Sequence, residues 1–295
     1  MNGQRLENIR PKIEALEAVP TIQVIVQPLV ALLRLPADQV DMEKVVELVS
    51  YDGTIAAHCL RMANSPLFGR RNTETVRSAV MALGLKRIEA ILLGCSLNSI
   101  VPPEKWVLDA VAFWRHSLGC ALVSRKMAML IGYPDPEKAY LAGLLHDLGI
   151  LVNTLACPED FQMCIQAARE GHAALHRSEE EHLGFTHCQS GKILAEQWRF
   201  SADVIEVVEF HHDVAPPTTQ PLVALVHLSD LLCRLRDLGY GYYEAMGVDL
   251  AGEAAWATLV EHHSALANMD LARLTMDIDG SMEEIVAVVD AVFKP

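Results

Sequence analysis

The chain has 295 residues, of which 51% are hydrophobic and 21% are charged, a composition that is typical of globular proteins and excludes a disordered chain. The formal net charge of −14 disfavours binding to nucleic acid, because an acidic surface repels phosphate groups. The seven cysteines form no C-x-x-C motif, and we expect buried, reduced thiols in a cytoplasmic protein.

No stretch of the sequence is predicted to cross a membrane. The most apolar stretch, residues 88–101, is shorter than the about 20 residues that a spanning helix needs, and Pro102 follows it. The charged N-terminus lacks the apolar core of a signal peptide. We therefore expect a cytoplasmic protein whose partners are neither membranes nor nucleic acid.

Helical periodicity dominates the first third of the chain. Apolar residues recur at three- and four-residue steps over 21–35, which predicts an amphipathic helix, and a further helix is predicted over 85–97. Pro36 ends the helix over 21–35. Two further helices are predicted to begin after the capping residues Asp41 and Asp52, and a third begins at Thr75 and is broken at Gly84.

A second helical block follows the prolines at 102–103, and strand-like alternation is absent throughout the sequence. We therefore predict an all-α fold with an N-terminal helical subdomain over 1–103, a second helical subdomain over 104–238 and a C-terminal helical extension over 239–295. The helices predicted in the second block cover residues 105–131, 137–151, 160–171, 187–198, 202–211 and 219–237.

Several predicted helices of the second block carry histidine or aspartate among apolar residues. His146 and Asp147 are flanked by Leu144, Leu145 and Leu148, which indicates that their helix is buried. A buried carboxylate costs several kcal/mol unless it is paired, hydrogen-bonded or bound to a metal. The residues in such positions are His116, His146, Asp147, His187, His211, His212 and Asp230.

Two interpretations of this set remain open. Imidazole and carboxylate ligands suit iron, manganese, zinc or nickel, so the set predicts a site for one or two divalent transition-metal ions, with iron or manganese favoured. Alternatively, the same side chains form hydrogen-bonded pairs in the core of a structural scaffold.

The order of these residues resembles the HD superfamily of metal-dependent phosphohydrolases and, within it, the HDOD family of bacterial signalling proteins. The stretches that carry the resemblance include YDGTIAAHCLRMANSPLFG, YLAGLLHDLG and GFTHCQSGKILAEQW, and the likeness runs from about residue 16 to 236. The resemblance implies a smaller N-terminal helical bundle packed on an HD-like helical bundle.

The resemblance also implies roles for the seven residues. His116, His146, Asp147 and Asp230 match the four defining metal ligands of the HD superfamily. Three further histidines match those that the cyclic-di-GMP-hydrolysing HD-GYP relatives use to bind additional metal ions. These are His187, His211 and His212.

Two departures weaken the case for catalysis. Ile150 stands where an HD-GYP enzyme has a lysine that holds the phosphate, and residues 214–217 replace the glycine-tyrosine-proline segment. We therefore expect a signalling module that holds a metal and acts mainly through protein contacts. The alternative is a metal-dependent phosphohydrolase acting on a nucleotide or cyclic dinucleotide, in which Asp147 is essential for turnover.

Overall fold

The structure is a computed structural model, and it describes residues 2–18, 39–50, 53–64, 73–88, 91, 101–214, 219–240, 249, 252–263, 266 and 271–293. The described residues form helices, turns and loops and contain no strand, so the predicted all-α fold is confirmed. The predicted helix over 21–35 and most of the one over 85–97 lie outside the described residues.

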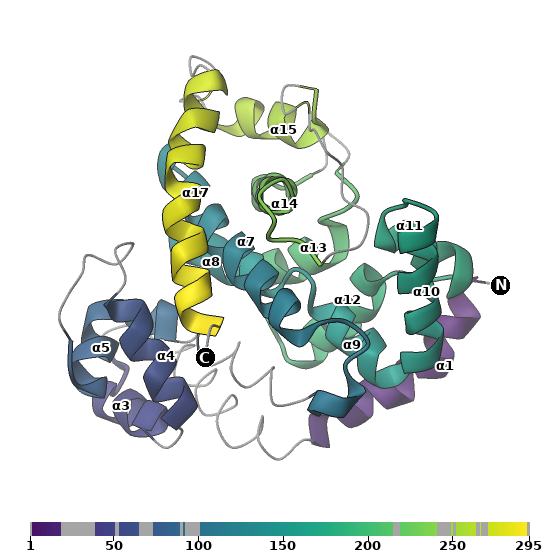
Figure 1. Cartoon of the computed structure of the whole chain (residues 1–295), viewed down its shortest axis with the longest axis horizontal. Helices are drawn as coiled ribbons and strands as arrows, with labels where there is room; N and C mark the ends of the chain where they lie inside the picture. The colour runs from purple at the N-terminus through teal and green to yellow at the C-terminus, as the bar shows by residue number, and fades with distance from the viewer. Residues whose placement is uncertain are drawn as a thin grey trace. The chain divides into compact units, whose positions relative to one another are not determined.

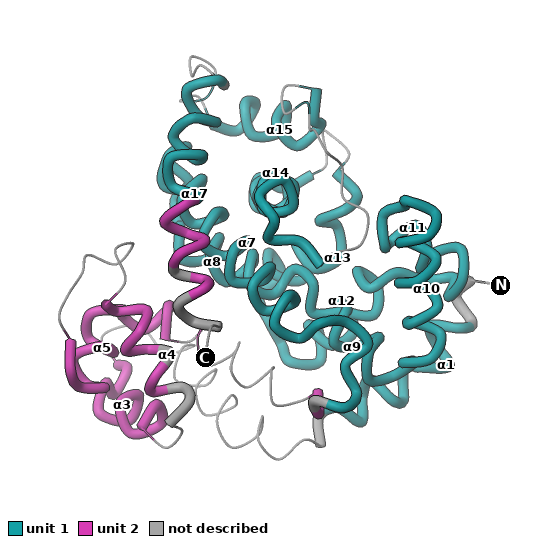
Figure 2. The backbone as a smooth tube through the Cα atoms, viewed as in Figure 1, with its two compact units in different colours: residues 1–16, 103–282 teal, residues 17–102, 283–295 magenta. Residues whose placement is uncertain are grey.

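The chain divides into two compact units (Figure 2). Unit 1 comprises residues 1–16 and 103–282, and unit 2 comprises residues 17–102 and 283–295. These units group the chain differently from the three consecutive segments expected from the sequence. The N-terminal helix belongs to unit 1, and the last helix, α17 (Leu271–Phe293), begins in unit 1 and ends in unit 2.

Unit 2 contains α3 (Met42–Ser50), α4 (Gly53–Ala63) and α5 (Val76–Leu83), each of which packs against the other two. The capping expected from the sequence is present at two of these helices. The Asp41 carboxylate accepts from the backbone N–H of Glu43 at 3.0 Å, and the Thr75 hydroxyl accepts from that of Ser78 at 3.1 Å.

Unit 1 holds most of the other described helices. The first are α1 (Asn2–Glu14), α7 (Ala110–Ile131), α8 (Pro136–Leu145), α9 (Leu148–Ala156), α10 (Pro158–Glu170) and α11 (Leu175–His182). They are followed by α12 (His187–Gln197), α13 (Ala202–Phe210), α14 (Pro221–Arg234), α15 (Ala254–His262) and the first part of α17.

The centre of unit 1 is built around α14, which Figure 1 shows nearly end-on, and around α7. Helix α14 packs against α7, α8, α13 and α15, while α12 packs against α9 and α13. Asp109 caps the start of α7 by accepting from two backbone N–H groups, and Gly132 ends it with a positive φ of 71°. The long α7 is mostly buried and carries polar side chains such as His116 into the core.

The single helix predicted over 137–151 is two helices in the structure, α8 and α9, with a turn at His146 and Asp147. The segment Pro136–Ala156 is apolar and long enough to cross a membrane. However, 89% of its most apolar 18-residue stretch is buried inside the protein, as is also found for core helices of this length and composition. In a continuous helix adjacent side chains diverge by about 100°. The turn instead lets His146 and Asp147 face the same point.

A close approach of α9 to α12 requires glycine on both helices. A Cβ at Gly149 would collide with the backbone carbonyl oxygen of His187, and a Cβ at Gly191 would lie 2.8 Å from the Gly149 nitrogen. Glycine at these two positions lets the two backbones touch. The contact fixes the start of α12, and therefore His187, beside the turn that carries Asp147.

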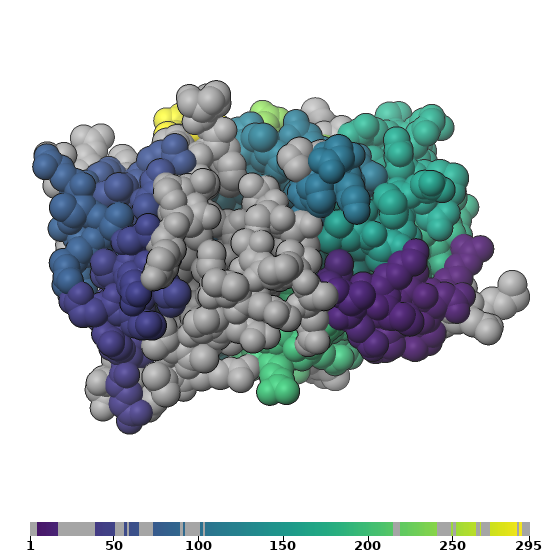
Figure 3. All heavy atoms as spheres, turned by 90° about the horizontal axis from the view of Figure 1, so that it is seen from below, coloured from purple at the N-terminus to yellow at the C-terminus, as the bar shows by residue number. Residues whose placement is uncertain are grey.

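Two helices of unit 1 were not predicted from the sequence. Helix α1 lies on the outside of the unit, where the space-filling view shows it in purple (Figure 3). Its Ile13 is buried, and Lys12 Nζ donates to the last carbonyl of α9, that of Ala156, at 2.9 Å. Helix α11 has the sequence LHRSEEEH, whose charges suggest a solvated loop, but its Leu175 and Glu179 are buried.

Candidate metal centre

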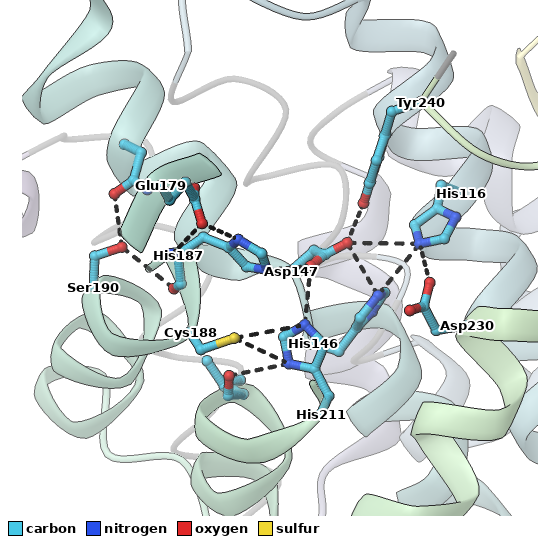
Figure 4. Close-up of polar contacts among 12 residues, drawn as sticks. His116, His146, Asp147, Glu179, His187, Cys188, Ser190, His211, Asp230 and Tyr240 are labelled. Carbon is cyan, nitrogen blue, oxygen red and sulfur yellow. Dashed lines mark hydrogen bonds and ion pairs between the residues drawn. The ribbon is translucent and has the colours of Figure 1, made fainter. Parts of the chain in front are cut away.

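The seven histidines and aspartates singled out from the sequence converge inside unit 1, and Figure 4 shows six of them, all but His212. His116 comes from α7, His187 begins α12, and Asp230 comes from α14. Six of the seven side chains are no more than 1% exposed, and His212 is half-buried. The six buried residues are His116, His146, Asp147, His187, His211 and Asp230.

The Asp147 carboxylate lies between two pairs of imidazoles. Its Oδ2 is 3.0 Å from His146 Nε2 and 3.6 Å from His116 Nε2. Its Oδ1 is 3.3 Å from His187 Nε2 and 3.2 Å from His211 Nε2. Each oxygen therefore serves one pair of histidines, which is the arrangement expected of a carboxylate that bridges two cations.

Asp230 completes the first of the two halves. Its Oδ1 is 3.1 Å from His116 Nε2 and also accepts from Arg234 Nε at 2.7 Å. The Nε2 atoms of His116 and His146 are 3.3 Å apart. His116, His146 and Asp230 thus form one potential ligand group with Cys120, all within 4.8 Å of one another.

All four imidazoles around Asp147 are anchored through Nδ1. His116 Nδ1 is 2.6 Å from the Leu238 carbonyl oxygen, and His146 Nδ1 is 2.8 Å from that of Gly143. His211 Nδ1 lies 3.1 Å from two carbonyl oxygens of α13, and His187 Nδ1 lies 2.6 Å from a Glu179 carboxylate oxygen. Because these oxygens only accept, each Nδ1 donates its proton, and each Nε2 is the ring nitrogen that faces the centre.

These donors fit a bound metal better than a set of hydrogen-bonded core pairs. Neutral His116 and His146 would point two lone pairs at each other, and only a proton or a cation between them removes that repulsion. His187 Nε2 and Asp147 Oδ1 are buried without a hydrogen-bond partner. Ligand atoms about 2.1 Å from an ion lie about 3.0–3.4 Å apart, which matches most of the separations measured here.

A buried network behind His187 contains Glu179, which sequence reasoning missed. Glu179 is fully buried and accepts from the His187 backbone N–H at 2.8 Å as well as from its Nδ1. Asn153 Nδ2 donates to Glu179 at 3.0 Å, and the Ser190 hydroxyl donates to Asn153 at 2.7 Å. The four-residue spacing of Glu179 from Leu175 and Leu183 was a signal that it faces the core.

Tyr240 is a second residue that the sequence did not reveal. Its side chain is buried, and its hydroxyl donates a hydrogen bond to Asp147 Oδ2. Its ring lies against His116, with ring centroids 4.4 Å apart. The Leu238 carbonyl and the Tyr240 hydroxyl therefore tie the segment after α14 to the centre.

His212 stands at the edge of the second half. Its ring centroid is 4.2 Å from that of His211 and 5.1 Å from that of His187, and its other face stacks on His176 at 4.4 Å. His176 is half-buried, and burial and nearby positive charge lower its pKa to about 3. Burial and His211 likewise lower the pKa of His212, which keeps its ring neutral and able to bind a metal.

The electrostatics of the centre keep both carboxylates ionised. Burial alone would raise the pKa of Asp147, but His146, His187 and His211 outweigh it and hold the pKa well below its ordinary value. Burial opposes ionisation at Asp230 in the same way, but Arg234 and His116 lower its pKa. Burial opposes protonation of His116, His187 and His211, but the anionic groups beside them outweigh it and raise the pKa of each ring, to about 10 for His211. A divalent cation would displace these protons and bind the ring nitrogens between the ionised carboxylates.

Two cysteines join the centre, although their apolar sequence contexts predicted plain buried thiols. Cys120 Sγ lies 3.5 Å from His116 Nε2, and Cys188 Sγ lies 3.9 Å from His211 Nε2. Burial would raise the pKa of Cys188, but His211 and His187 lower it to about 6. Sulfur donors are therefore available beside each half of the centre.

Comparison with known proteins identifies the fold family. A family model of the HDOD domain matches residues 19–214 of the chain. The chain belongs to the HDOD family. Asp230 and Tyr240 lie beyond the matched residues, so part of the centre comes from the segment after residue 214.

Solved structures resemble the chain over its length. An HDOD domain protein of unknown function from Geobacter sulfurreducens is 28% identical, with a TM-score of 0.80 and 99% of both chains covered. A candidate signal transduction protein from Marinobacter aquaeolei is 21% identical, with a TM-score of 0.73, over 99% of this chain and 65% of the other. A candidate phosphohydrolase from Shewanella amazonensis is 20% identical, with a TM-score of 0.70, over 96% and 97%. The latter two show the shared fold.

A curated but uncharacterized protein from Treponema pallidum is 27% identical over 206 residues. The match covers 67% of this chain and 39% of that protein, so this HDOD chain spans less than half of the relative's length.

Proposed function

We propose that this HDOD protein is a signalling module whose unit 1 holds one or two divalent transition-metal ions and acts through contacts with protein partners. The observation that carries the proposal is the position of Asp147, whose two oxygens each face a pair of histidine Nε2 atoms at 3.0–3.6 Å. His116, His146 and Asp230 would hold one ion, and His187, His211 and His212 would hold the other.

The surroundings of the centre favour a regulatory role over turnover. Ile150, at the position of a phosphate-binding lysine in HD-GYP enzymes, is fully buried, so it supplies no cation for a substrate. The candidate ligands other than His212 are likewise buried, and the Tyr240 hydroxyl donates a hydrogen bond to Asp147 Oδ2. A metal held there would stabilise the fold of unit 1 in a state that a partner recognises.

A metal-dependent phosphohydrolase acting on a nucleotide or cyclic dinucleotide is the second candidate. It is favoured by the position of the Asp147 carboxylate between two pairs of histidines, since paired ions in such sites would lower the pKa of water and neutralise charge on a phosphoryl group. In that reaction Asp147 would keep the two halves at a fixed separation, and the Nδ1 contacts would hold the imidazoles in place.

Metal content tests the proposed centre directly. We expect purified wild-type protein to carry near-stoichiometric metal by elemental analysis, and Asp147→Asn to lose most of it because both halves share this carboxylate. Asp160→Asn, which changes an exposed carboxylate of α10, should retain the wild-type metal content. Wild-type protein that stays metal-free after both aerobic and anaerobic purification would rule out the centre.

Turnover separates the two candidates. We expect the metal-loaded protein to leave cyclic dinucleotides, nucleotides and a chromogenic phosphodiester intact. Metal-dependent hydrolysis that disappears in Asp147→Asn but persists in Asp160→Asn would establish the phosphohydrolase instead.

A further inference from the structure

Cys188 lies at the second half of the centre and plays no part in the function proposed above. It follows His187 directly in the first turn of α12 and is 5% exposed. Its Sγ lies 3.9 Å from both Nε2 and Nδ1 of His211, so the sulfur is equally close to the two ring nitrogens (Figure 4). Donor atoms of His187, Cys188, His211 and His212 all lie within 4.8 Å of one another.

Two buried polar atoms near this sulfur are without a hydrogen-bond partner. His187 Nε2 and Asp147 Oδ1 are buried, have no hydrogen-bond partner and lie 3.3 Å apart. A tetrahedral ion with bonds of about 2.0–2.1 Å to nitrogen and about 2.3 Å to sulfur separates the two donors by about 3.6 Å. The observed 3.9 Å between Cys188 Sγ and His211 Nε2 is close to this value.

We propose that Cys188 is a thiolate ligand of the ion held by His187, His211 and Asp147. The inference rests on the proposed function, because it requires the metal centre. On binding, the thiol proton leaves to solvent and the sulfur lone pair forms the bond to the metal. A thiolate favours zinc, cobalt or iron over manganese or magnesium, so this half of the centre selects a softer ion.

The other half differs from this one. Cys120 Sγ is 3.5 Å from His116 Nε2, but that nitrogen also faces Asp230 Oδ1 at 3.1 Å and Asp147 Oδ2 at 3.6 Å. Two carboxylates therefore supply the anionic ligands of the first half, which needs no sulfur. In the second half, Asp147 Oδ1 is the carboxylate oxygen that pairs with the Nε2 atoms of His187 and His211 among the described residues, since Glu179 contacts the opposite ring nitrogen of His187. Cys188 would supply a second anionic donor on this side.

Spectroscopy of the cobalt-loaded protein tests the assignment without an activity assay. We expect wild-type protein to show a near-ultraviolet sulfur-to-cobalt charge-transfer band, and zinc absorption fine structure to show sulfur at about 2.3 Å. Cys188→Ser should lose both signals. Cys120→Ser and Cys164→Ser, which remove a thiol of the first half and a buried thiol of α10, should keep them.

Ion selectivity distinguishes a metal-binding role of Cys188 from a purely structural one, because a structural role would not change the selectivity. We expect Cys188→Ser to lower the ratio of zinc to manganese affinity by at least about tenfold, because only zinc gains from the sulfur. A packing defect would instead weaken both ions alike. Circular dichroism of the metal-free variants checks folding, and Cys188→Ala serves if the serine variant misfolds.

The outcomes separate this inference from the function on which it rests. Metal-loaded wild-type protein without a sulfur signal, or a signal that survives in Cys188→Ser, would overturn the thiolate ligand and leave the metal centre standing. Wild-type protein that binds no cobalt or zinc would overturn both.

Discussion

At the scale of single residues, the centre depends on how its imidazoles are held. His116, His146 and His211 donate Nδ1–H to main-chain carbonyls, so their orientation follows from the backbone itself. His187 differs because its Nδ1 partner is the carboxylate of Glu179. A carboxylate behind an imidazole fixes the tautomer and makes Nε2 a stronger donor.

Glu179 is therefore expected to tune metal affinity. Glu179→Gln keeps the size of the side chain but removes the charge, and we expect metal affinity to fall by about 10- to 100-fold. Glu180→Gln, which changes an exposed neighbour on the same helix, should leave the affinity unchanged. Competition with a chromogenic chelator measures both, and equal affinities in the two variants would contradict the role of Glu179.

At the scale of helices, the sequence predicted most of unit 1 but not the break at the centre. The apolar run over 137–151 has helical periodicity on both sides of His146, so it gives no sign of a turn there. Helix α11 was missed for a different reason, since its exposed charges conceal a buried face. Cys188 and Tyr240 were missed because their roles arise from contacts between distant segments, which no local pattern records.

The Gly149–Gly191 contact leads to a prediction at this scale. Gly149→Ala forces α9 away from α12, and we expect it to reduce the free energy of unfolding of the metal-free protein by about 1–3 kcal/mol or more. It should also lower metal affinity, because His187 moves with α12. Urea unfolding and metal titration measure the two effects.

Gly280→Ala is the matched control. Gly280 lies in α17, and a Cβ there would meet nothing within 4 Å. We expect this variant to be as stable as the wild type or up to about 1 kcal/mol more stable, because alanine favours a helix over glycine. Similar losses of unfolding free energy in Gly149→Ala and Gly280→Ala would show that stability does not depend on the close α9–α12 contact.

At the scale of the whole molecule, the candidate ligands belong to unit 1, and none comes from unit 2 among the described residues. Six of the helices of unit 1, from α7 to α14, carry or adjoin candidate ligands: α7, α8, α9, α12, α13 and α14. An ion held by them cross-links helices that are distant in sequence. Its binding free energy therefore adds to the stability of unit 1.

Metal removal should consequently destabilise unit 1 selectively. At a free metal concentration 100 times the dissociation constant, binding stabilises by about 2.7 kcal/mol, which raises the melting temperature by about 5–10 °C. Calorimetry with and without chelator measures the shift, and Asp147→Asn should show none. Hydrogen exchange should slow in α7 and α12 on metal addition and stay unchanged in α3, α4 and α5.

The burial of the candidate ligands also affects the rate at which a metal ion would exchange. Because six of the candidate ligands are no more than 1% exposed, a bound ion would reach or leave the centre only when the helices around it separate. The residence time of the ion is then limited by how often unit 1 opens, however tightly or weakly the ligands bind at equilibrium. Such a centre exchanges its metal slowly, so it keeps the ion acquired at folding and responds to later changes in metal supply with a delay.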